Sequence, residues 1–258
     1  MTSLKNKIVF VTGASSGIGR ACALAFAREG SKLLLCARRK ERLVELADQI
    51  RTSYRTDCHS FELDVRIQKD VETAIHTLPQ PWKAIDILVN NAGLSRGLDK
   101  LHEGNLTDWE EMIDTNVKGL LYVSRVVIPG MVQRRSGHIV NLGSIAGHEV
   151  YPGGNVYCAS KHAVDAITKG MQIDLVDTPI RVSSVDPGMV ETEFSVVRFH
   201  GDTRRAEKVY KGITPLTGED VAEAIIFCVT RPPHVNIHQL RIMPTTQASA
   251  TIAHREEK

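Results

Sequence analysis

Ile8-Val9-Phe10-Val11-Thr12-Gly13-Ala14-Ser15-Ser16-Gly17-Ile18-Gly19-Arg20 is the stretch that decides the fold. Its apolar first part predicts a buried strand, and a helical pattern follows from Ala21 to Glu29. Glycines at such a turn let the backbone approach a ligand, and the helix N-terminus offers free N–H groups with a partial positive charge. The spacing is G-x-x-x-G-x-G, not the G-x-G-x-x-G of many dinucleotide sites. The stretch therefore predicts a phosphate-binding turn, although a tight connection without a ligand would use the same glycines.

Apolar runs alternate with amphipathic stretches of helical length along the rest of the chain. The expected strands are Ile8–Thr12, Lys32–Ala37, His59–Leu63, Ile87–Asn90, His138–Leu142, Arg181–Asp186 and Ile237–Ile242. The expected helices are Gly17–Glu29, Arg39–Ser53, Ile67–Leu78, Asp108–Arg134, Val156–Val176 and Glu219–Thr230, the last capped by Thr217. Continuous Val/Ile/Leu strands separated by helices predict a doubly wound α/β fold, with a parallel sheet covered on both faces. We find no internal repeat or dividing linker and expect one domain over residues 1–258.

Tyr157 and Lys161 form a pattern with acid–base chemistry. They stand at i and i+4, so on a helix they share one face, and Ser144 lies thirteen residues before the tyrosine. A phenol is a poor base by itself, because its pKa is near ~10. An adjacent ammonium favours the phenolate and lowers that pKa, while the serine hydroxyl can hold a substrate oxygen in line. The three residues predict proton transfer to or from an alcohol.

The chain resembles the short-chain dehydrogenase/reductase family in motifs that follow the family's order. They are the Thr12–Gly19 turn, Asp64-Val65, Asn90-Asn91-Ala92-Gly93, Asn116, Ser144, Tyr157, Lys161 and Pro187-Gly188. The resemblance implies a Rossmann fold with seven parallel strands in the order 3-2-1-4-5-6-7 and a mobile substrate lid over residues 188–216. It makes Asn116, Ser144, Tyr157 and Lys161 the catalytic tetrad, with Asn116 holding a water behind Lys161. Each tetrad residue alone would equally suit a cap, a turn or a surface position.

The resemblance also implies which residues bind the dinucleotide. They are Gly13, Ser15, Ser16, Gly17, Ile18, Gly19, Asp64, Val65, Asn91, Ala92, Gly93, Tyr157, Lys161, Pro187, Gly188, Val190 and Thr192. The second expected strand ends in Arg38 and Arg39, with no acidic residue at its tip. An acid there would bind a ribose 2′-hydroxyl, whereas an arginine accommodates a 2′-phosphate, with Ser15 as a further donor. We therefore expect NADP(H), although the two arginines would also suit the start of a solvated helix.

Several segments outside the common motifs resemble the NADP-dependent 3-hydroxy acid dehydrogenases, which act on serine, allo-threonine and the matching semialdehydes. These segments are Asn155–Tyr157, Glu193–Phe199, His200–Asp202 and Met243–Ser249. A carboxylate substrate calls for a cation, and Arg198 is the first candidate, followed by Arg96. Ser144, Glu149 and Tyr151 are the other expected substrate contacts. Arg198 would equally suit a charged surface position on a lid.

Composition excludes other classes of function. The net charge is only +2 over 258 residues, so neither nucleic acid nor a membrane surface is an expected partner. The five cysteines show no metal-binding spacing, which favours reduced thiols, no metal site and a cytoplasmic protein. Cys158 is expected to be a packing residue. The family resemblance implies a homotetramer built on the two longest helices, although their apolar positions would equally suit the internal core of a single chain.

Two other functions remain open from the sequence. One is a broad NADPH-dependent reductase of carbonyl compounds and aldehydes, including sulfonated aldehydes. The other is a binding protein that senses NADPH without turnover, and the complete tetrad argues against it. The sequence does not identify the substrate, its stereochemistry or the physiological direction.

Overall fold

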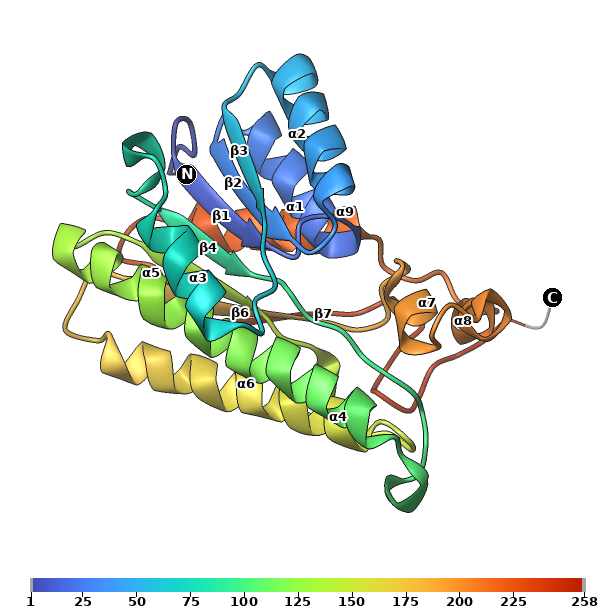
Figure 1. Ribbon diagram of the computed structural model, residues 1–258. Coiled ribbons are helices and arrows are strands. Elements are labelled where there is room, and N and C mark those ends of the chain that lie inside the picture. Colours follow the sequence, from blue (N-terminus) through green and yellow to red (C-terminus); the bar gives the residue numbers. More distant parts are fainter. Residues whose placement is uncertain (1, 257–258) are drawn as a thin grey trace.

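Seven parallel strands form one sheet at the centre of the structure, a computed structural model that describes residues 2–256 (Figure 1). The strands are β1 (Ile8–Thr12), β2 (Lys32–Ala37), β3 (Cys58–Glu62), β4 (Ile87–Asn90), β5 (His138–Leu142), β6 (Arg181–Pro187) and β7 (Gln239–Ile242). Their order, β3-β2-β1-β4-β5-β6-β7, confirms the predicted Rossmann topology. The order reverses between β1 and β4, and ligands of such sheets bind at the carboxyl ends of the strands near this point.

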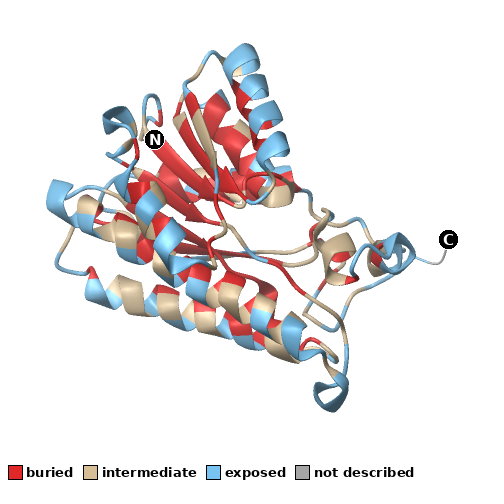
Figure 2. Cartoon of the chain, viewed as in Figure 1, coloured by how far each residue is buried: buried red, intermediate tan, exposed pale blue. Residues whose placement is uncertain are grey.

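Helices cover both faces of the sheet. On one face lie α1 (Gly17–Arg28), α2 (Lys40–Tyr54) and α9 (Gly218–Val229); on the other lie α3 (Gln68–His76), α5 (Leu120–Arg134) and α6 (Asn155–Asp174). Successive strand residues point to opposite faces. Val9 and Val11 of β1 therefore pack in the core beneath α1 and α9, whereas Ile8 and Phe10 pack beneath α3 and α5. Figure 2 shows the resulting buried sheet between half-exposed helices.

The expected helix Asp108–Arg134 is wrong as a single element. Its place is taken by α4 (Leu106–Ile113), a π-helical segment η3 (Asp114–Gly119) and α5. Within η3, Gly119 approaches the preceding β3–α3 connection so closely that an added Cβ would lie 2.7 Å from the Val65 side chain. The wider π turn buries Asn116. Such bulges are frequent at functional sites, and apolar periodicity does not reveal them.

The remaining short elements are the 3₁₀ turns η1 (Gln80–Trp82), η2 (Leu101–Glu103) and η4 (Ile145–Gly147), together with the helices α7 (Phe194–Arg198) and α8 (Thr203–Tyr210). Both short helices lie within the predicted lid, where the sequence indicated no framework helix. A parallel bridge between Val190 and Leu216 joins the two ends of this segment. The lid is therefore a closed loop anchored at its base, beside the carboxyl ends of the strands (Figure 1).

Two further expectations about local structure are confirmed. The Thr217 side chain accepts a hydrogen bond from the Asp220 amide and caps α9, while Asp220 accepts one from the Thr217 amide in return. The five cysteines are all buried and free, and Cys158 packs in an apolar cluster. Among residues 2–256, no helix has both the length and the apolar character that a bilayer-spanning helix needs.

Candidate functional site

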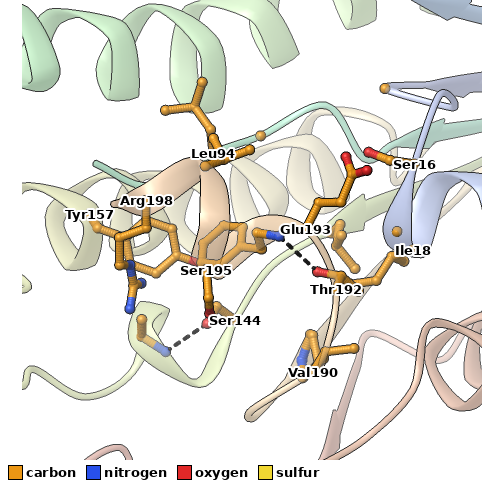
Figure 3. Close-up of a pocket in the computed structure, with 18 of the residues that line it drawn as sticks. Ser16, Ile18, Leu94, Ser144, Tyr157, Val190, Thr192, Glu193, Ser195 and Arg198 are labelled. Carbon is orange, nitrogen blue, oxygen red and sulfur yellow. Dashed lines mark hydrogen bonds between the residues drawn. The ribbon is translucent and has the colours of Figure 1, made fainter. Parts of the chain in front are cut away.

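A cavity of about 830 Å³ opens at the carboxyl ends of the strands, between the glycine turn and the lid (Figure 3). Its size is typical of a cofactor or ligand pocket. Most of the predicted site residues line it: Gly13, Ser15, Ser16, Gly17, Ile18, Arg38, Arg39, Asp64, Val65, Asn91, Ala92, Gly93, Ser144, Tyr151, Tyr157, Lys161, Pro187, Gly188, Val190, Thr192 and Arg198. Gly19, Asn116 and Glu149 are the predicted residues outside this lining.

The glycine turn has the shape of a phosphate cradle. Gly13 and Gly17 have φ values of +66° and +51°, which side-chain-bearing residues rarely adopt. A Cβ at Gly13 would lie 2.9 Å from the Ala92 backbone, and one at Gly19 would lie 2.4 Å from the Asn91 amide nitrogen. Gly19 therefore allows α1 to pack against Asn91, while the turn leaves its backbone open to the cavity. These residues fit the diphosphate of a dinucleotide.

Asn91 ties the end of β4 to the end of β1. Its Nδ2 donates to the Thr12 carbonyl at 2.8 Å, and its backbone N–H donates to the Thr12 hydroxyl at 3.1 Å. Asp64 accepts hydrogen bonds from Arg66, and its carboxylate keeps a lowered pKa because these bonds and charges outweigh the opposing effect of burial. The roles predicted for Asp64 and Val65 at the adenine remain predictions, and both residues line the cavity.

The two arginines after β2 differ in position. Arg39 lies over the glycine turn, with Nη2 donating to Ser16 Oγ at 2.6 Å and Nε donating to Ser15 Oγ at 3.3 Å. Arg38 instead pairs with Glu111 of α4 at 3.2 Å. Arg39 is thus the better placed of the two for a 2′-phosphate, although both line the cavity. A run of two arginines in the sequence could not distinguish them.

Tyr157, Lys161 and Ser144 come together at the other end of the cavity. Tyr157 and Lys161 lie one turn apart on α6 and are both buried. Lys161 Nζ donates to the Leu142 carbonyl at the end of β5, at 2.8 Å. Ser144 follows the same strand and accepts a hydrogen bond from Ala146 at 3.1 Å, so its side chain also caps the η4 turn.

Burial is the largest influence on the pKa of both Tyr157 and Lys161. It raises the pKa of the Tyr157 phenol, and the Arg198 guanidinium and the neighbouring Ser144 hydroxyl oppose that rise. Burial lowers the pKa of Lys161 to about 8, and the Asp186 carboxylate opposes that fall. We expected Lys161 to be the cation that favours the phenolate, but here the leading cation is Arg198. The folded lid brings its guanidinium carbon to 5.5 Å from the Tyr157 ring centroid.

Asn116 supports the site from behind the cavity wall. Its Oδ1 accepts from the Leu94 amide, and its Nδ2 donates to the Leu94 carbonyl, both at 2.8 Å. Nδ2 also donates to Ser160 Oγ on α6 at 3.0 Å. A Cβ on Gly93 would lie 3.2 Å from Asn116 Oδ1 and 3.8 Å from Lys161 Nζ, so the two side chains approach each other around this glycine. The water expected behind Lys161 remains a prediction.

The predicted substrate residues divide into two groups. Arg198 lies beside the Tyr157 ring and donates to Ser95 Oγ at 3.1 Å and to the Tyr151 hydroxyl at 3.0 Å. Tyr151 thus reaches the cavity as expected. Glu149 lies outside the cavity lining and accepts a hydrogen bond from the amide of Ala250, a lining residue of the C-terminal segment. A sequence position between Ser144 and Tyr157 did not reveal this direction.

Arg96, the second candidate cation, is held by Glu111 Oε2 at 2.7 Å. Its Nη1 donates to the Val197 carbonyl of the lid. Arg96 lines the cavity as Arg198 does, but its guanidinium is engaged by Glu111 and by the lid carbonyl, so it supports the lid.

Sequence reasoning missed three contributors to the cavity. Ser95 orients Arg198, and the Phe194 ring meets the Tyr157 ring edge-on at 5.6 Å between centroids. Gln247 accepts a hydrogen bond from the Met189 amide at 2.8 Å and brings the C-terminal segment to the cavity. Phe194 and Gln247 lie in segments that resemble the 3-hydroxy acid dehydrogenases, and that resemblance could have marked them as site residues. No sequence feature marked Ser95.

Known proteins resemble the chain over nearly its whole length. An NADP-dependent 3-hydroxy acid dehydrogenase of Shigella flexneri is 47% identical over 251 residues, which are 96% of this chain and 100% of that protein. Sulfoacetaldehyde reductase 2 of Chromohalobacter salexigens is 47% identical over 247 residues, covering 95% and 97%. The structure of the closed form of serine dehydrogenase complexed with NADP+ superposes with a TM-score of 0.91 at 46% identity, covering 97% and 100%. A family model described as short chain dehydrogenase matches residues 7–202.

The family model spans the glycine turn, the tetrad and about half of the lid, and these relatives match 95–96% of this chain. The chain therefore belongs to the short-chain dehydrogenase family.

Proposed function

We propose that the chain is an NADP(H)-dependent oxidoreductase that interconverts a 3-hydroxy acid, such as serine or allo-threonine, with the matching carbonyl compound. One observation carries the proposal. A single cavity holds the phosphate cradle with Arg39 at one end and Tyr157 with Lys161 at the other, and Arg198 lies above the tyrosine ring. The names of the relatives support the same cofactor and substrate class.

The side chains divide the chemistry among them. When bound, the nicotinamide ring supplies or accepts the hydride. Tyr157 takes the alcohol proton in oxidation and returns it to the carbonyl oxygen in reduction. Ser144 donates to that oxygen and holds it in line.

Lys161 supplies a further positive charge, in addition to that of Arg198, that favours a phenolate at Tyr157. Its pKa of about 8 leaves it mostly protonated at neutral pH. Asp186 favours this protonated form. Asn116 fixes the wall behind Lys161 through its bonds to Leu94 and Ser160.

Arg198 supplies the charge that selects an acidic substrate. Its bonds to Ser95 and Tyr151 use only part of its N–H donors and fix the plane of the guanidinium. A guanidinium held in this way can bind a carboxylate through two parallel hydrogen bonds. Because it lies within 5.5 Å of the Tyr157 ring centroid, the clamped acid group would keep the reacting carbon near the phenol.

A turnover assay tests the proposal. Purified protein with NADP+ is mixed with serine, allo-threonine or 3-hydroxybutyrate, and NADPH is followed by its absorbance. We expect turnover with these acids, a lower rate with NAD+, and a rate at least about 10²-fold lower with the matched Tyr157→Phe protein. No turnover in either direction with any hydroxy acid or semialdehyde would contradict it and favour an NADPH-sensing protein.

A second candidate is the reduction of sulfonated aldehydes. A sulfonate has the charge and oxygen geometry that Arg198 would bind, and one relative is named as a sulfoacetaldehyde reductase. The same panel therefore includes sulfoacetaldehyde, malonic semialdehyde and a neutral ketone. Higher kcat/KM for sulfoacetaldehyde than for malonic semialdehyde would replace the 3-hydroxy acid assignment, whereas equal rates on the neutral ketone would indicate a broad carbonyl reductase.

We also propose a cytoplasmic homotetramer. Its support is a set of large apolar side chains exposed on α5, α6 and α9: Leu121, Val132, Ile173 and Phe227. Burial of such side chains between copies is favourable, and because α9 lies on the opposite face of the sheet from α5 and α6, they offer two separate surfaces for contact. Light scattering after size-exclusion chromatography should give about four times the chain mass, and a monomer mass would contradict it.

A further inference from the structure

The acidic side chain of Glu193 lies between Arg39 and Arg42, the arginine cluster beside the glycine turn. Glu193 lies on the lid immediately before α7, and its two carboxylate oxygens reach different partners. Oε2 is 2.8 Å from Arg39 Nη1, and Oε1 is 2.5 Å from Arg42 Nη1. Figure 3 shows Glu193 extending from the lid towards Ser16.

The cluster is arranged for an anion. Arg39 precedes α2 and Arg42 lies in its first turn, so the two guanidinium groups share one side of the helix. Ser15 and Ser16 fix the Arg39 side chain over the phosphate cradle. An anion between the arginines therefore meets donors whose positions are already set, which is the geometry that a 2′-phosphate requires.

Glu193 and a 2′-phosphate cannot share this place without cost. The carboxylate is ionised at neutral pH, because hydrogen bonds and charges from Arg39 and Arg42 outweigh partial burial and lower its pKa. Two anions a few ångströms apart repel, and both would need the same N–H donors. Glu193 is also attached to a segment that touches the cradle: a Cβ on Gly17 would lie 3.2 Å from Thr192.

We propose that Glu193 is an internal anion that occupies the 2′-phosphate site in the free protein and is displaced when NADP(H) binds. This inference rests on the proposed NADP(H) dependence. It makes Glu193 a determinant of cofactor specificity, because binding of a 2′-phosphate must break two ion pairs, whereas binding of a dinucleotide without that phosphate leaves them intact.

The test measures binding of adenosine 2′,5′-bisphosphate and of ADP, which lacks the 2′-phosphate, by isothermal titration calorimetry. Glu193→Gln should bind the bisphosphate more tightly by roughly threefold to tenfold, since exposed ion pairs are individually weak. Its affinity for ADP should stay unchanged. Glu191→Gln, an exposed acid two residues away on the same lid, is the matched control and should match the wild type with both nucleotides.

The other outcomes overturn the inference. Unchanged bisphosphate binding by Glu193→Gln would make the ion pairs an ordinary solvated cluster. Weaker binding would mean that Glu193 positions the arginines for the phosphate, and equal gains for both nucleotides would indicate a general effect of the lid. Failure of the NADP(H) assignment has a separate signature: the wild type would bind ADP as tightly as the bisphosphate, and Arg39→Gln would change neither affinity.

Discussion

Replacement of Arg198 by methionine should separate acidic from neutral substrates. The unbranched methionine side chain keeps much of the apolar stem of arginine and removes the guanidinium. That group contacts Ser95 and Tyr151 and lies 5.5 Å from the Tyr157 ring centroid. Loss of its charge-assisted hydrogen bonds to a carboxylate costs on the order of 2–3 kcal/mol. KM for a 3-hydroxy acid should therefore rise by about 30- to 160-fold.

The same substitution has a second effect that both substrate classes share. The Arg198 charge lowers the pKa of Tyr157, in opposition to the larger effect of burial. Without that charge the pKa of Tyr157 rises further, so the acidic limb of the pH profile for alcohol oxidation, where Tyr157 becomes protonated, should move to higher pH with either substrate. The ratio of kcat/KM for serine to that for a neutral alcohol cancels this shared effect. It therefore isolates the contribution of the hydrogen bonds from Arg198 to the substrate carboxylate.

The assay is steady-state oxidation with saturating NADP+, following NADPH over a range of pH. Arg205→Met is the matched control, because Arg205 also lies on the lid and stacks on Phe199 at 4.4 Å, outside the cavity lining. Arg205→Met should keep the wild-type ratio. An equal loss of kcat/KM on serine and on the neutral alcohol in Arg198→Met would refute the proposal that Arg198 binds the substrate carboxylate.

Tyr157→Phe should lower kcat by about 10²- to 10⁴-fold while NADPH binding, measured by fluorescence, stays near the wild-type value; near-normal turnover would remove Tyr157 as the acid–base group. Because burial lowers the Lys161 pKa from 10.5 to about 8, the folded chain releases this proton at lower pH than the unfolded chain does. In denaturant titrations, the difference in free energy of unfolding between the wild type and Lys161→Met should thus stay constant below about pH 8 and rise by up to about 3 kcal/mol towards pH 10.5. A difference that does not change with pH would count against the effect of burial on the Lys161 pKa. Thr217→Ala should lower the free energy of unfolding by about 1 kcal/mol through loss of the α9 cap, with exposed Thr214→Ala as the control; equal urea midpoints for the two would contradict the cap.

The order of the strands and the glycine turn could be predicted because local signals determine them. An apolar run such as Ile8–Thr12, followed by glycines and a helical pattern, specifies one arrangement, and four of the seven expected strands have the observed bounds. The π-helical segment could not be predicted. It depends on contacts of Asn116 and Gly119 with residues distant in sequence, Leu94 and Val65, and leaves apolar spacing almost unchanged.

Within the candidate site, residue types were predictable but directions were not. The spacing of Tyr157 and Lys161 placed them on one helical face, because α-helical geometry alone sets that relation. The direction of Glu149, and the preference of Arg38 for Glu111, depend on which partner lies nearby in the folded chain. Such choices among polar partners differ little in energy at exposed positions and have no periodic signature.

The shortness of α7 has a consequence for attempts to re-engineer this enzyme. Glu193 precedes a helix of five residues, about 7.5 Å long at the usual rise per residue, and Arg198 is the last residue of that helix. One end contacts the arginines at the glycine turn and the other carries the guanidinium over Tyr157. Substitutions at Glu193 chosen to switch coenzyme preference should therefore also reposition Arg198, the proposed acid-binding group, and the two traits should evolve together, with strongly non-additive double mutants.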